Sequence, residues 1–437
     1  MKLIKEPTTS VTVKFPVEKN NLGEIETITG IRIIHSNLHL PSFGGLRLNN
    51  FLSYEDLEAA AALNSYKAAL HNVPFGGAIG CIFIDPSKYT YEEKVRIVRR
   101  YTVELWKRSM IGASTDIMGP DRGTDWKIMN IIQDTYKTVI SHNALEVDAV
   151  VTGKSIRFGG IKDTQVASGF SSAKCAEFVL QNVENEKFKN TKLARGGKKS
   201  IILHGLTKNS VNLVKNLPKG DFKVIGIVEG KYGCFNTLGF DIDEIQEYLL
   251  KNNTLKGISQ TLNDPKEILC KKADFYIPAK ELIVNKEIAE NLQCKIVLEA
   301  SNFAIQKDAI DVFKARKLVV VPDIISHSGE LVVAYLEWLK NLEHRNLTLL
   351  FKRFDSNTRN TMVKMITDSD YGILENLYTG PEESDLILST LNEIVDNSFK
   401  TVLDYCQEHK VSLREAAYMI AIERIYVIFK TRGGLSI

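Results

Sequence analysis

The sequence predicts an α/β protein with a mixed α/β domain first, then a doubly wound parallel sheet, and helices at the C-terminus. Three observations support this prediction. In the first part of the chain, β-branched and polar residues alternate. From residue 200 onward, short apolar runs alternate with helical patterns. Long amphipathic stretches follow towards the C-terminus. The 437 residues are enough for two or three domains, each with its own core.

The composition narrows the class of protein. Apolar residues make up 44% and charged residues 25%, which is typical of a folded globular chain. The chain has 56 Lys and Arg residues and 53 Asp and Glu residues. The resulting net charge of +3 gives no general attraction to nucleic acid or acidic membranes. No apolar run reaches the roughly 18 residues of a transmembrane segment. The six cysteines form no C-x-x-C pair and the histidines have no metal-like spacing, so we expect reduced thiols and no metal site.

The first block of the chain alternates strands and helices. Alternating β-branched residues, and one short apolar run, predict strands at residues 11–17, 30–40 and 81–84. Helical spacing of apolar residues predicts helices at 54–71 and 89–108, with Ser53 as the N-cap of the first. A glycine-dense turn at 73–80 leads into the last of these strands.

The second block has the pattern of a parallel sheet. Short apolar runs predict strands at residues 201–204, 223–228, 275–278, 295–298 and 318–321. A polar linker at 184–199 precedes them, and a helix at 209–217 follows the first strand to begin a βαβ unit. Helical patterns at 332–343 and 385–429 close the chain, separated in part by a polar stretch at 368–384.

Several motifs, taken together, resemble those of one enzyme family. They are Pro41-Ser-Phe-Gly-Gly-Leu-Arg47, Tyr66-Lys67, Val73-Pro-Phe-Gly-Gly-Ala78, Pro120-Asp121, Thr152-Gly-Lys, Gly159-Gly160, Pro322-Asp323 and Tyr335-Leu-Glu-Trp-Leu-Lys-Asn341. In order and spacing they resemble the glutamate dehydrogenases of the Glu/Leu/Phe/Val dehydrogenase family. Within that family, the chain is most similar to the hexameric, mitochondrial, animal-type branch that carries an antenna.

The resemblance implies a domain order, an assembly and a location. It places an N-terminal substrate and assembly domain at residues 1–155 and a Rossmann-type dinucleotide domain at 156–335. A C-terminal helical region at 336–437 would carry a shortened antenna-like segment at 345–384. The resemblance also implies a homo-oligomer in the mitochondrial matrix. The N-terminus itself shows no targeting pattern, so either the protein is cytoplasmic or the sequence begins after a processing site.

Two positions keep residues that the family uses on its substrate. Asp121 matches an aspartate that serves as proton shuttle, and Lys67 matches a lysine that binds a substrate carboxylate. Another interpretation stays open for each. Asp121 also fits an N-cap or turn before a helix at 126–130, and Lys67 fits an ordinary solvated helix lysine.

Four other positions lack the groups that the family uses. Ile79 stands at the place of the catalytic lysine, and Phe43 at that of a lysine that holds the α-carboxylate. Thr164 replaces an arginine, and Ala334 a substrate-binding serine. Loss of a positioned electrophile, acid or base commonly slows a reaction by about 100- to 10,000-fold. We therefore expect little affinity for glutamate or 2-oxoglutarate.

The first strand-to-helix turn of the second block is a degraded dinucleotide motif. Such turns carry three glycines, but Gly205-Leu-Thr207-Lys-Asn-Ser210 keeps only the first. Thr207 brings a β-branched side chain to the point where phosphate should approach the backbone, and Ser210 replaces the packing glycine. We expect weak pyrophosphate binding, assisted by Lys208.

Three more residues are candidates for contact with the cofactor. Glu229 follows the second strand of this block and fits the acidic residue that binds ribose, which would favour NAD over NADP. A strand-end glutamate in water explains it equally well. The resemblance adds Asn302, which matches an asparagine near the nicotinamide, and Ser168, which lies in the family's Ala-Thr-Gly turn. NAD is thus the expected cofactor, if any binds.

Three functions are compatible with this pattern. The one we favour is a catalytically silent relative that serves as a structural or regulatory subunit of a homo-oligomer, a mixed oligomer or a larger mitochondrial assembly. The second is an active NAD-dependent amino-acid dehydrogenase, which releases a 2-oxo acid and ammonia. The third is a binding protein that uses the basic run Arg195-Gly-Gly-Lys-Lys199. A change of substrate alone does not explain the changes at both sites.

Overall fold

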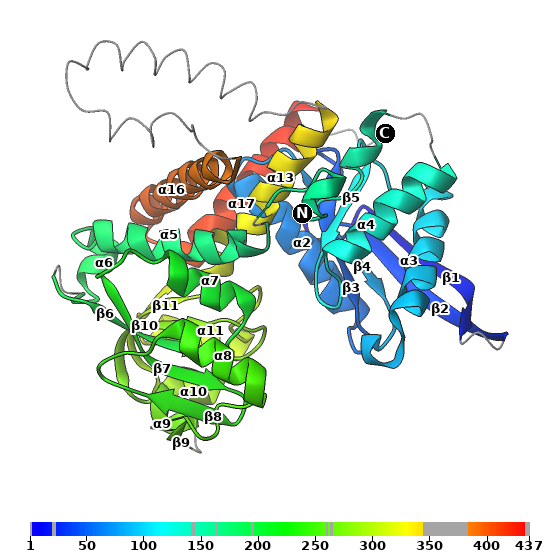
Figure 1. Ribbon diagram of the computed structural model, residues 1–437. Helices are drawn as coiled ribbons and strands as arrows, with labels where there is room; N and C mark the ends of the chain where they lie inside the picture. The colour runs from blue at the N-terminus through cyan, green and yellow to red at the C-terminus, as the bar shows by residue number, and fades with distance from the viewer. Residues whose placement is uncertain are drawn as a thin grey trace, which may run out of the picture. The chain divides into compact units, whose positions relative to one another are not determined.

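The computed structural model describes residues 2–19, 23–140, 145–162, 164–193, 196–258, 261–262, 265–343 and 383–432 (Figure 1). The chain divides into two compact units. The first unit contains Met1–Ser65, Pro74–Thr164 and Val333–Thr390, and the second contains Tyr66–Val73, Gln165–Val332 and Leu391–Ile437. Residues 344–382, which hold almost all of the predicted antenna-like segment 345–384, lie outside the described residues.

The first unit is built on a five-stranded mixed sheet in the order β1-β2-β4-β3-β5. Its strands are β1 (Thr9–Lys19), β2 (Glu24–Ile34), β3 (Ser42–Leu48), β4 (Gly76–Ile82) and β5 (Asp116–Pro120). The β1–β2 and β2–β4 pairs are antiparallel, whereas β3 runs parallel to both β4 and β5. Parallel pairing therefore brings the carboxyl ends of β3, β4 and β5 to the same edge.

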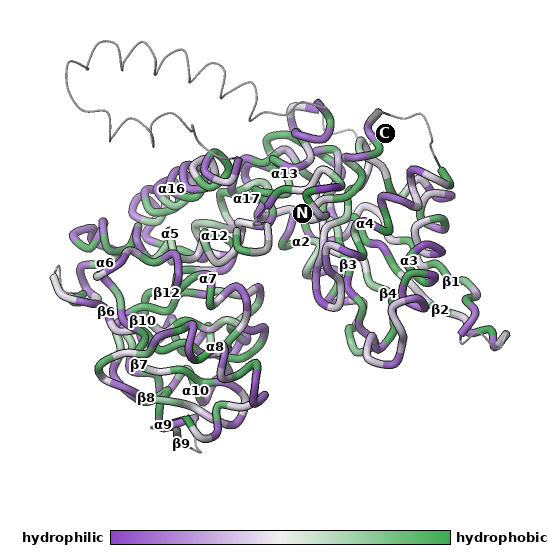
Figure 2. The backbone as a smooth tube through the Cα atoms, viewed as in Figure 1, coloured by the Kyte–Doolittle hydropathy of each residue, from purple (hydrophilic) through white to green (hydrophobic). Residues whose placement is uncertain are grey.

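Helices cover this sheet. They include α3 (Tyr91–Trp106), α4 (Trp126–Thr135) and α2 (Tyr54–Leu70), whose last residues, from Tyr66 on, belong to the second unit; α1 (Lys2–Lys5) precedes β1. Thr90 and Glu93 form a capping box that starts α3, and Asp125 caps α4. Apolar residues recur along α3 between hydrophilic ones (Figure 2), and they pack with α4 against one face of the sheet.

A fully buried ion pair fixes β2, β3 and β5 to one another. The Arg32 guanidinium donates to both carboxylate oxygens of Asp116, over 2.6 and 2.7 Å. Its other N–H groups donate to the backbone carbonyls of Gly44, Gly45 and Ile117. Every guanidinium donor is therefore satisfied, as burial of this charge requires.

The second unit is built on a seven-stranded sheet in the order β12-β11-β10-β6-β7-β8-β9. Its strands are β6 (Lys199–His204), β7 (Phe222–Glu229), β8 (Tyr232–Phe235), β9 (Thr261–Leu262), β10 (Lys272–Pro278), β11 (Gln293–Leu298) and β12 (Val319–Val321). The five strands from β12 to β7 are parallel, and β8 and β9 add antiparallel neighbours at one edge. This is a doubly wound, Rossmann-type sheet.

Helices lie on both faces of this sheet (Figure 1). The helices of this unit are α5 (Ala167–Gln181), α6 (Glu186–Lys189), α7 (Lys208–Asn216), α8 (Ile242–Asn252), α9 (Pro265–Leu269), α10 (Lys286–Asn291), α11 (Lys307–Ala315), α12 (Asp323–Ser326), α17 (Leu413–Thr431) and most of α16 (Glu383–His409), whose first residues belong to the first unit. The helix α13 (Gly329–Leu342) starts in this unit and ends in the first. Apolar residues of α9, α10 and α11 pack on one face of the sheet. None of the helices in the described part of the chain is long and apolar enough to cross a membrane.

The α/β class is confirmed, but several element bounds were wrong. The strand predicted at 30–40 is β2, which ends at Ile34 and begins earlier because its whole length pairs with β1. The predicted turn at 73–80 already contains the start of β4 at Gly76. The predicted linker 184–199 contains α6. The glycine-rich β3 and the short β5 were missed because neither shows two-residue alternation of apolar and polar residues.

Candidate functional site

Parallel pairing brings several predicted site residues of the first unit to one face of its sheet. Phe43 of β3 pairs with Gly77 of β4, and Arg47 pairs with Cys81. Because side chains alternate along a strand, Ile79 shares this face with Phe43 and Arg47. Ile79 is 1% exposed. The position that the resemblance gives to a catalytic lysine is therefore a core position here.

Asp121 follows β5 and forms an ion pair with Arg47. The Arg47 Nε donates to Asp121 Oδ2 over 2.8 Å, and the Arg122 N–H donates to Oδ1 over 2.7 Å. A Cβ on Gly45 would lie 2.5 Å from the Asp121 Cβ, so only glycine leaves room for this side chain. Asp121 stands in a turn, but the N-cap of α4 is Asp125. Its carboxylate is about a quarter exposed and already neutralised by Arg47.

An aromatic cluster holds the side chain at the second changed position. The Phe43 ring stacks on Phe75 at 5.5 Å, and Phe75 meets Tyr335 and Trp338 edge to face, each also at 5.5 Å. Aromatic pairs of this kind contribute about 0.5–1.5 kcal/mol each beyond the burial of their area. Phe43 therefore stabilises the packing of the first unit and offers no charge to a carboxylate.

The remaining changed positions are also buried. Ala334, on α13, is 1% exposed. Thr164 is buried and donates its hydroxyl to the Ile161 carbonyl over 3.0 Å. Nearby in the sequence of α13, the Glu337 carboxylate is fully buried and pairs with Lys154 of the Thr-Gly-Lys motif at 3.2 Å. The buried charges of Lys154 and Glu337 thus compensate each other.

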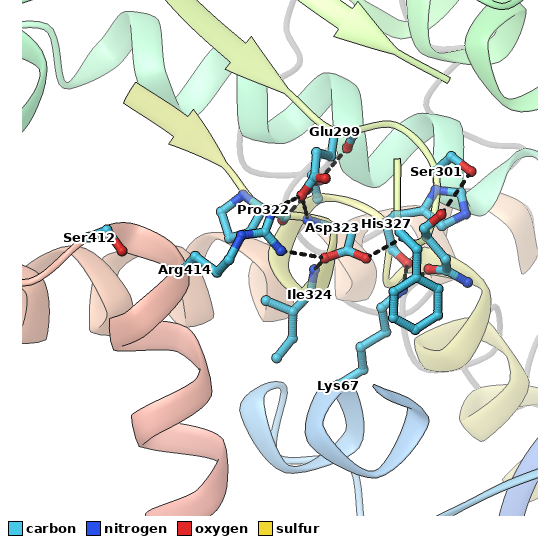
Figure 3. Close-up of polar contacts among 12 residues, drawn as sticks. Lys67, Glu299, Ser301, Pro322, Asp323, Ile324, His327, Ser412 and Arg414 are labelled. Atoms are coloured by element: carbon cyan, nitrogen blue, oxygen red, sulfur yellow. Dashed lines mark hydrogen bonds and ion pairs between the residues drawn. The ribbon is translucent and has the colours of Figure 1, made fainter. Parts of the chain in front are cut away.

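In the second unit, Lys67 is a buried lysine held by hydrogen bonds (Figure 3). Its ammonium donates to the Asn302 side-chain oxygen over 2.5 Å and to the His327 backbone carbonyl. The interpretation of Lys67 as a solvated helix lysine is therefore wrong. Burial and the Lys67 charge lower the pKa of His327 to about 3, so its ring is neutral. Lys67 was predicted to bind the substrate and Asn302 to lie near the cofactor. The structure brings the two residues together, and they bind each other.

The turn after β6 satisfies its own backbone donors. Gly205 has a φ of +101°, a conformation that favours glycine. Thr207 is the N-cap of α7: its hydroxyl accepts from the Ser210 N–H, and the Ser210 hydroxyl accepts from the Thr207 N–H over 2.8 Å. These amides, at the place where a helix N-terminus would hold phosphate, are occupied by side chains of the same turn.

Glu229 occupies one more donor of this turn. Its carboxylate accepts from the Leu206 N–H over 2.6 Å and pairs with Lys280, a residue that the sequence interpretation did not single out. A strand-end glutamate bound only to water is thus the wrong description. Ser168 is buried in α5, and its hydroxyl accepts a long hydrogen bond of 3.4 Å from the Glu330 N–H.

These contacts test whether the site fits NAD. The turn geometry at Gly205 is suitable, but three of the amides that a pyrophosphate would use already have partners, and Glu229 is engaged by Lys280. As it stands in this structure, the site does not fit a dinucleotide.

Within the described residues, no group of three or more His, Cys, Asp and Glu side chains could hold a metal ion.

A buried charge cluster of the second unit escaped the sequence analysis (Figure 3). Arg414 of α17 pairs with Glu299, which follows β11, and with Asp323, over 3.5 Å for the latter. The Asp323 N–H also donates to the Glu299 carboxylate over 2.9 Å. Glu299 and Asp323 are each 1% exposed. The sequence analysis recognised the motif Pro322-Asp323. It did not predict the contacts of Asp323 with Glu299 and Arg414, because these residues lie 24 and 91 positions away in the sequence.

We predict that this cluster makes stability depend on pH. Burial, together with the charge of Asp323, raises the pKa of Glu299 from 4.5 to about 7, although Arg414 opposes the change. Between these values the folded protein holds more protons than the unfolded chain, so the free energy of unfolding falls as pH rises through this window.

The measurement is urea unfolding of the wild type and of Glu299→Gln at several pH values between about 5 and 8. As the pH rises across this range, the free energy of unfolding should fall more for the wild type than for the variant, because the variant has no carboxyl group at position 299 to titrate. Equal pH dependence in the two proteins would contradict the prediction.

Comparison with known proteins agrees with this architecture. Residues 7–138 match the model of the Glu/Leu/Phe/Val dehydrogenase dimerisation domain, and residues 159–376 match that of the glutamate/leucine/phenylalanine/valine dehydrogenases. The mitochondrial glutamate dehydrogenase of Dictyostelium discoideum is 31% identical over 99% of this chain and 87% of its own length. The NAD-specific glutamate dehydrogenase of Clostridioides difficile is 28% identical over 99% of this chain and 92% of its own.

A solved structure gives the same result. The hetero-hexameric glutamate dehydrogenase of Thermus thermophilus, in its leucine-bound form, is 25% identical and superposes with a TM-score of 0.78. The match covers 98% of this chain and 91% of that one. The resemblance read from the motifs is thus confirmed, and the chain belongs to the Glu/Leu/Phe/Val dehydrogenase family.

Proposed function

We propose that this chain is a catalytically silent member of the family that acts as a structural or regulatory subunit of an oligomer. The observation that carries the proposal is the burial of Ile79 at the position of the catalytic lysine. An aliphatic side chain can neither polarise a carbonyl nor move a proton. The first unit keeps the proton-shuttle candidate Asp121, but it lacks the electrophile beside it.

Two further contacts support the proposal. Phe43 stands in an aromatic cluster, where a substrate carboxylate would lose its hydration without gaining a cation. Lys67 donates to Asn302 and to the His327 carbonyl, so substrate binding would have to break hydrogen bonds of a buried ammonium. The substrate site thus lacks the charge-assisted bonds that fix an anion.

Two findings from the comparisons support a proposal about the partner in such an assembly. The dimerisation-domain match favours self-association, and the relative from Thermus thermophilus is hetero-hexameric. We propose that this chain forms a homo-oligomer or joins an active relative or a larger assembly. We place it in the mitochondrial matrix, as the name of the Dictyostelium discoideum relative suggests, with the cytoplasm as the alternative.

We also propose a role for each part of the chain. Residues 1–155 would form the assembly domain, 156–335 the dinucleotide-type domain, and 336–437 a helical region with the shortened antenna. The two compact units cut across these ranges, because 66–73 and 391–437 belong to the second unit.

The proposal is tested by mixing the purified protein with NADH, ammonia and 2-oxoglutarate and following NADH absorbance. We expect no consumption above background, while an active glutamate dehydrogenase in the same buffer serves as the positive control. Robust turnover would refute the silent function. Separation of native extract by size then distinguishes a homo-oligomer from a larger complex.

An active NAD-dependent dehydrogenase is the second candidate. Asp121 and Lys67 favour it, because both match residues that the family uses on its substrate. The relative from Clostridioides difficile is NAD-specific, which makes NAD the cofactor to test first. Screening the same assay with glutamate, leucine, phenylalanine and valine in the oxidative direction separates the two candidates.

A further inference from the structure

Three neighbouring strands of the second unit end side by side, and one lysine crosses the middle one. The strands are β10, β6 and β7, in that order in the sheet. Lys280 lies two residues after β10. A Cβ on Gly205, directly after β6, would lie 2.9 Å from the Lys280 Cγ, so the lysine stem lies against this turn. The Lys280 ammonium then reaches Glu229 at the end of β7.

This crossing lies where a dinucleotide would bind. Open α/β sheets bind ligands outside the carboxyl ends of their parallel strands, and the pyrophosphate approaches the backbone of the first strand-to-helix turn. Here the Lys280 stem covers Gly205, the glycine that forms the tight turn between β6 and α7. Glu229, the candidate for ribose binding, is turned inward to Leu206 N–H and to Lys280.

We propose that Lys280 is a strap that keeps the nucleotide turn closed, so that a dinucleotide binds only after displacing Lys280 from Gly205 and Glu229. The inference rests on the proposed function and deepens it, because it names a contact that weakens cofactor binding by this subunit. Glu229 supplies the anion that the turn would otherwise take from phosphate. Lys280 holds that carboxylate in place, and the capping box of Thr207 and Ser210 completes the closure.

The strap is weak enough to be opened by a ligand or a mutation. The Lys280 side chain is 40% exposed and that of Glu229 19%, so solvent screens much of their attraction. Apparent affinity falls in proportion to the fraction of protein in the open state. A pair of this kind therefore lowers the affinity for a dinucleotide by about fivefold at most, and its removal should restore that factor.

The experiment is titration of the full-length protein with NADH, followed by NADH fluorescence and by calorimetry. Lys280→Ala should bind NADH about three- to fivefold more tightly than the wild type. Lys215→Ala is the matched control: Lys215 pairs with Asp243 at 2.6 Å, has a similar exposure of 44%, and lies at the other end of α7. The control should bind NADH as the wild type does.

Lys280→Met keeps most of the stem and removes the charge, and it replaces Lys280→Ala if that variant does not fold. A gain of about threefold or more in Lys280→Met supports the strap. Unchanged or weaker NADH binding in the folded variants, including no measurable binding in any of them, would overturn it. Turnover of substrate by the wild type would refute the silent function but not the strap, because the strap is judged only by the difference in NADH affinity.

Discussion

Replacing Arg414 by alanine lowers the free energy of unfolding by about 3–5 kcal/mol near pH 8, where Glu299 is charged. The variant leaves Glu299 and Asp323, each 1% exposed, without their cation. Their mutual repulsion adds to the cost of burying them. The effect is measured by urea unfolding, with the midpoint and slope determined for both proteins.

Lys314→Ala is the control for this prediction. Lys314 pairs with Glu415, the neighbour of Arg414 on α17, at 2.8 Å, but its side chain is 70% exposed. A pair as exposed as this contributes about 0–1 kcal/mol. If both variants lose the same small stability, the buried cluster does not hold α17 in the second unit.

Replacing Ile79 by lysine destabilises the protein and restores no activity. An ammonium at this buried position of β4 loses its hydration, and Arg47, on the same face of the sheet, already pairs with Asp121. We expect the free energy of unfolding to fall by about 3 kcal/mol or more. Urea unfolding checks the stability, and NADH consumption with 2-oxoglutarate and ammonia checks the activity.

The activity stays absent because the other changes remain. Phe43 keeps its place among the aromatic rings, and the nucleotide turn stays closed by Glu229 and Lys280. Ile79→Val is the conservative control, with a loss of about 0.5–1.5 kcal/mol. A stable Ile79→Lys variant with new turnover would show that this single position silenced an otherwise intact site.

The sequence was most informative where the type of a single residue, or the pattern of a single segment, is enough to predict its environment. Ile79 and Phe43 were recognised as apolar replacements, and both are buried. The parallel strands of the second unit were predicted because strands covered on both faces are apolar throughout. The strands β8 and β9 were not predicted, since short antiparallel edge strands lack such a run.

The sequence was least informative where two distant residues meet. Lys67 looks like any helix lysine until Asn302, 235 positions away, accepts its hydrogen bond. Lys280 gives no signal in the loop after β10, and it gains a role only because β10 and β7 flank β6. Periodicity reports the environment of one segment, whereas these contacts depend on the order of strands in the sheet.

The long sequence separation between Arg414 and its partners, 115 residues from Glu299 and 91 from Asp323, has a consequence for biosynthesis. Glu299 and Asp323 leave the ribosome long before the helix that carries their counter-ion. Until then the second unit holds two carboxylates that its core cannot accept without cost. The second unit therefore completes its fold only after α17 has been translated, and until then this surface is exposed to chaperones and proteases.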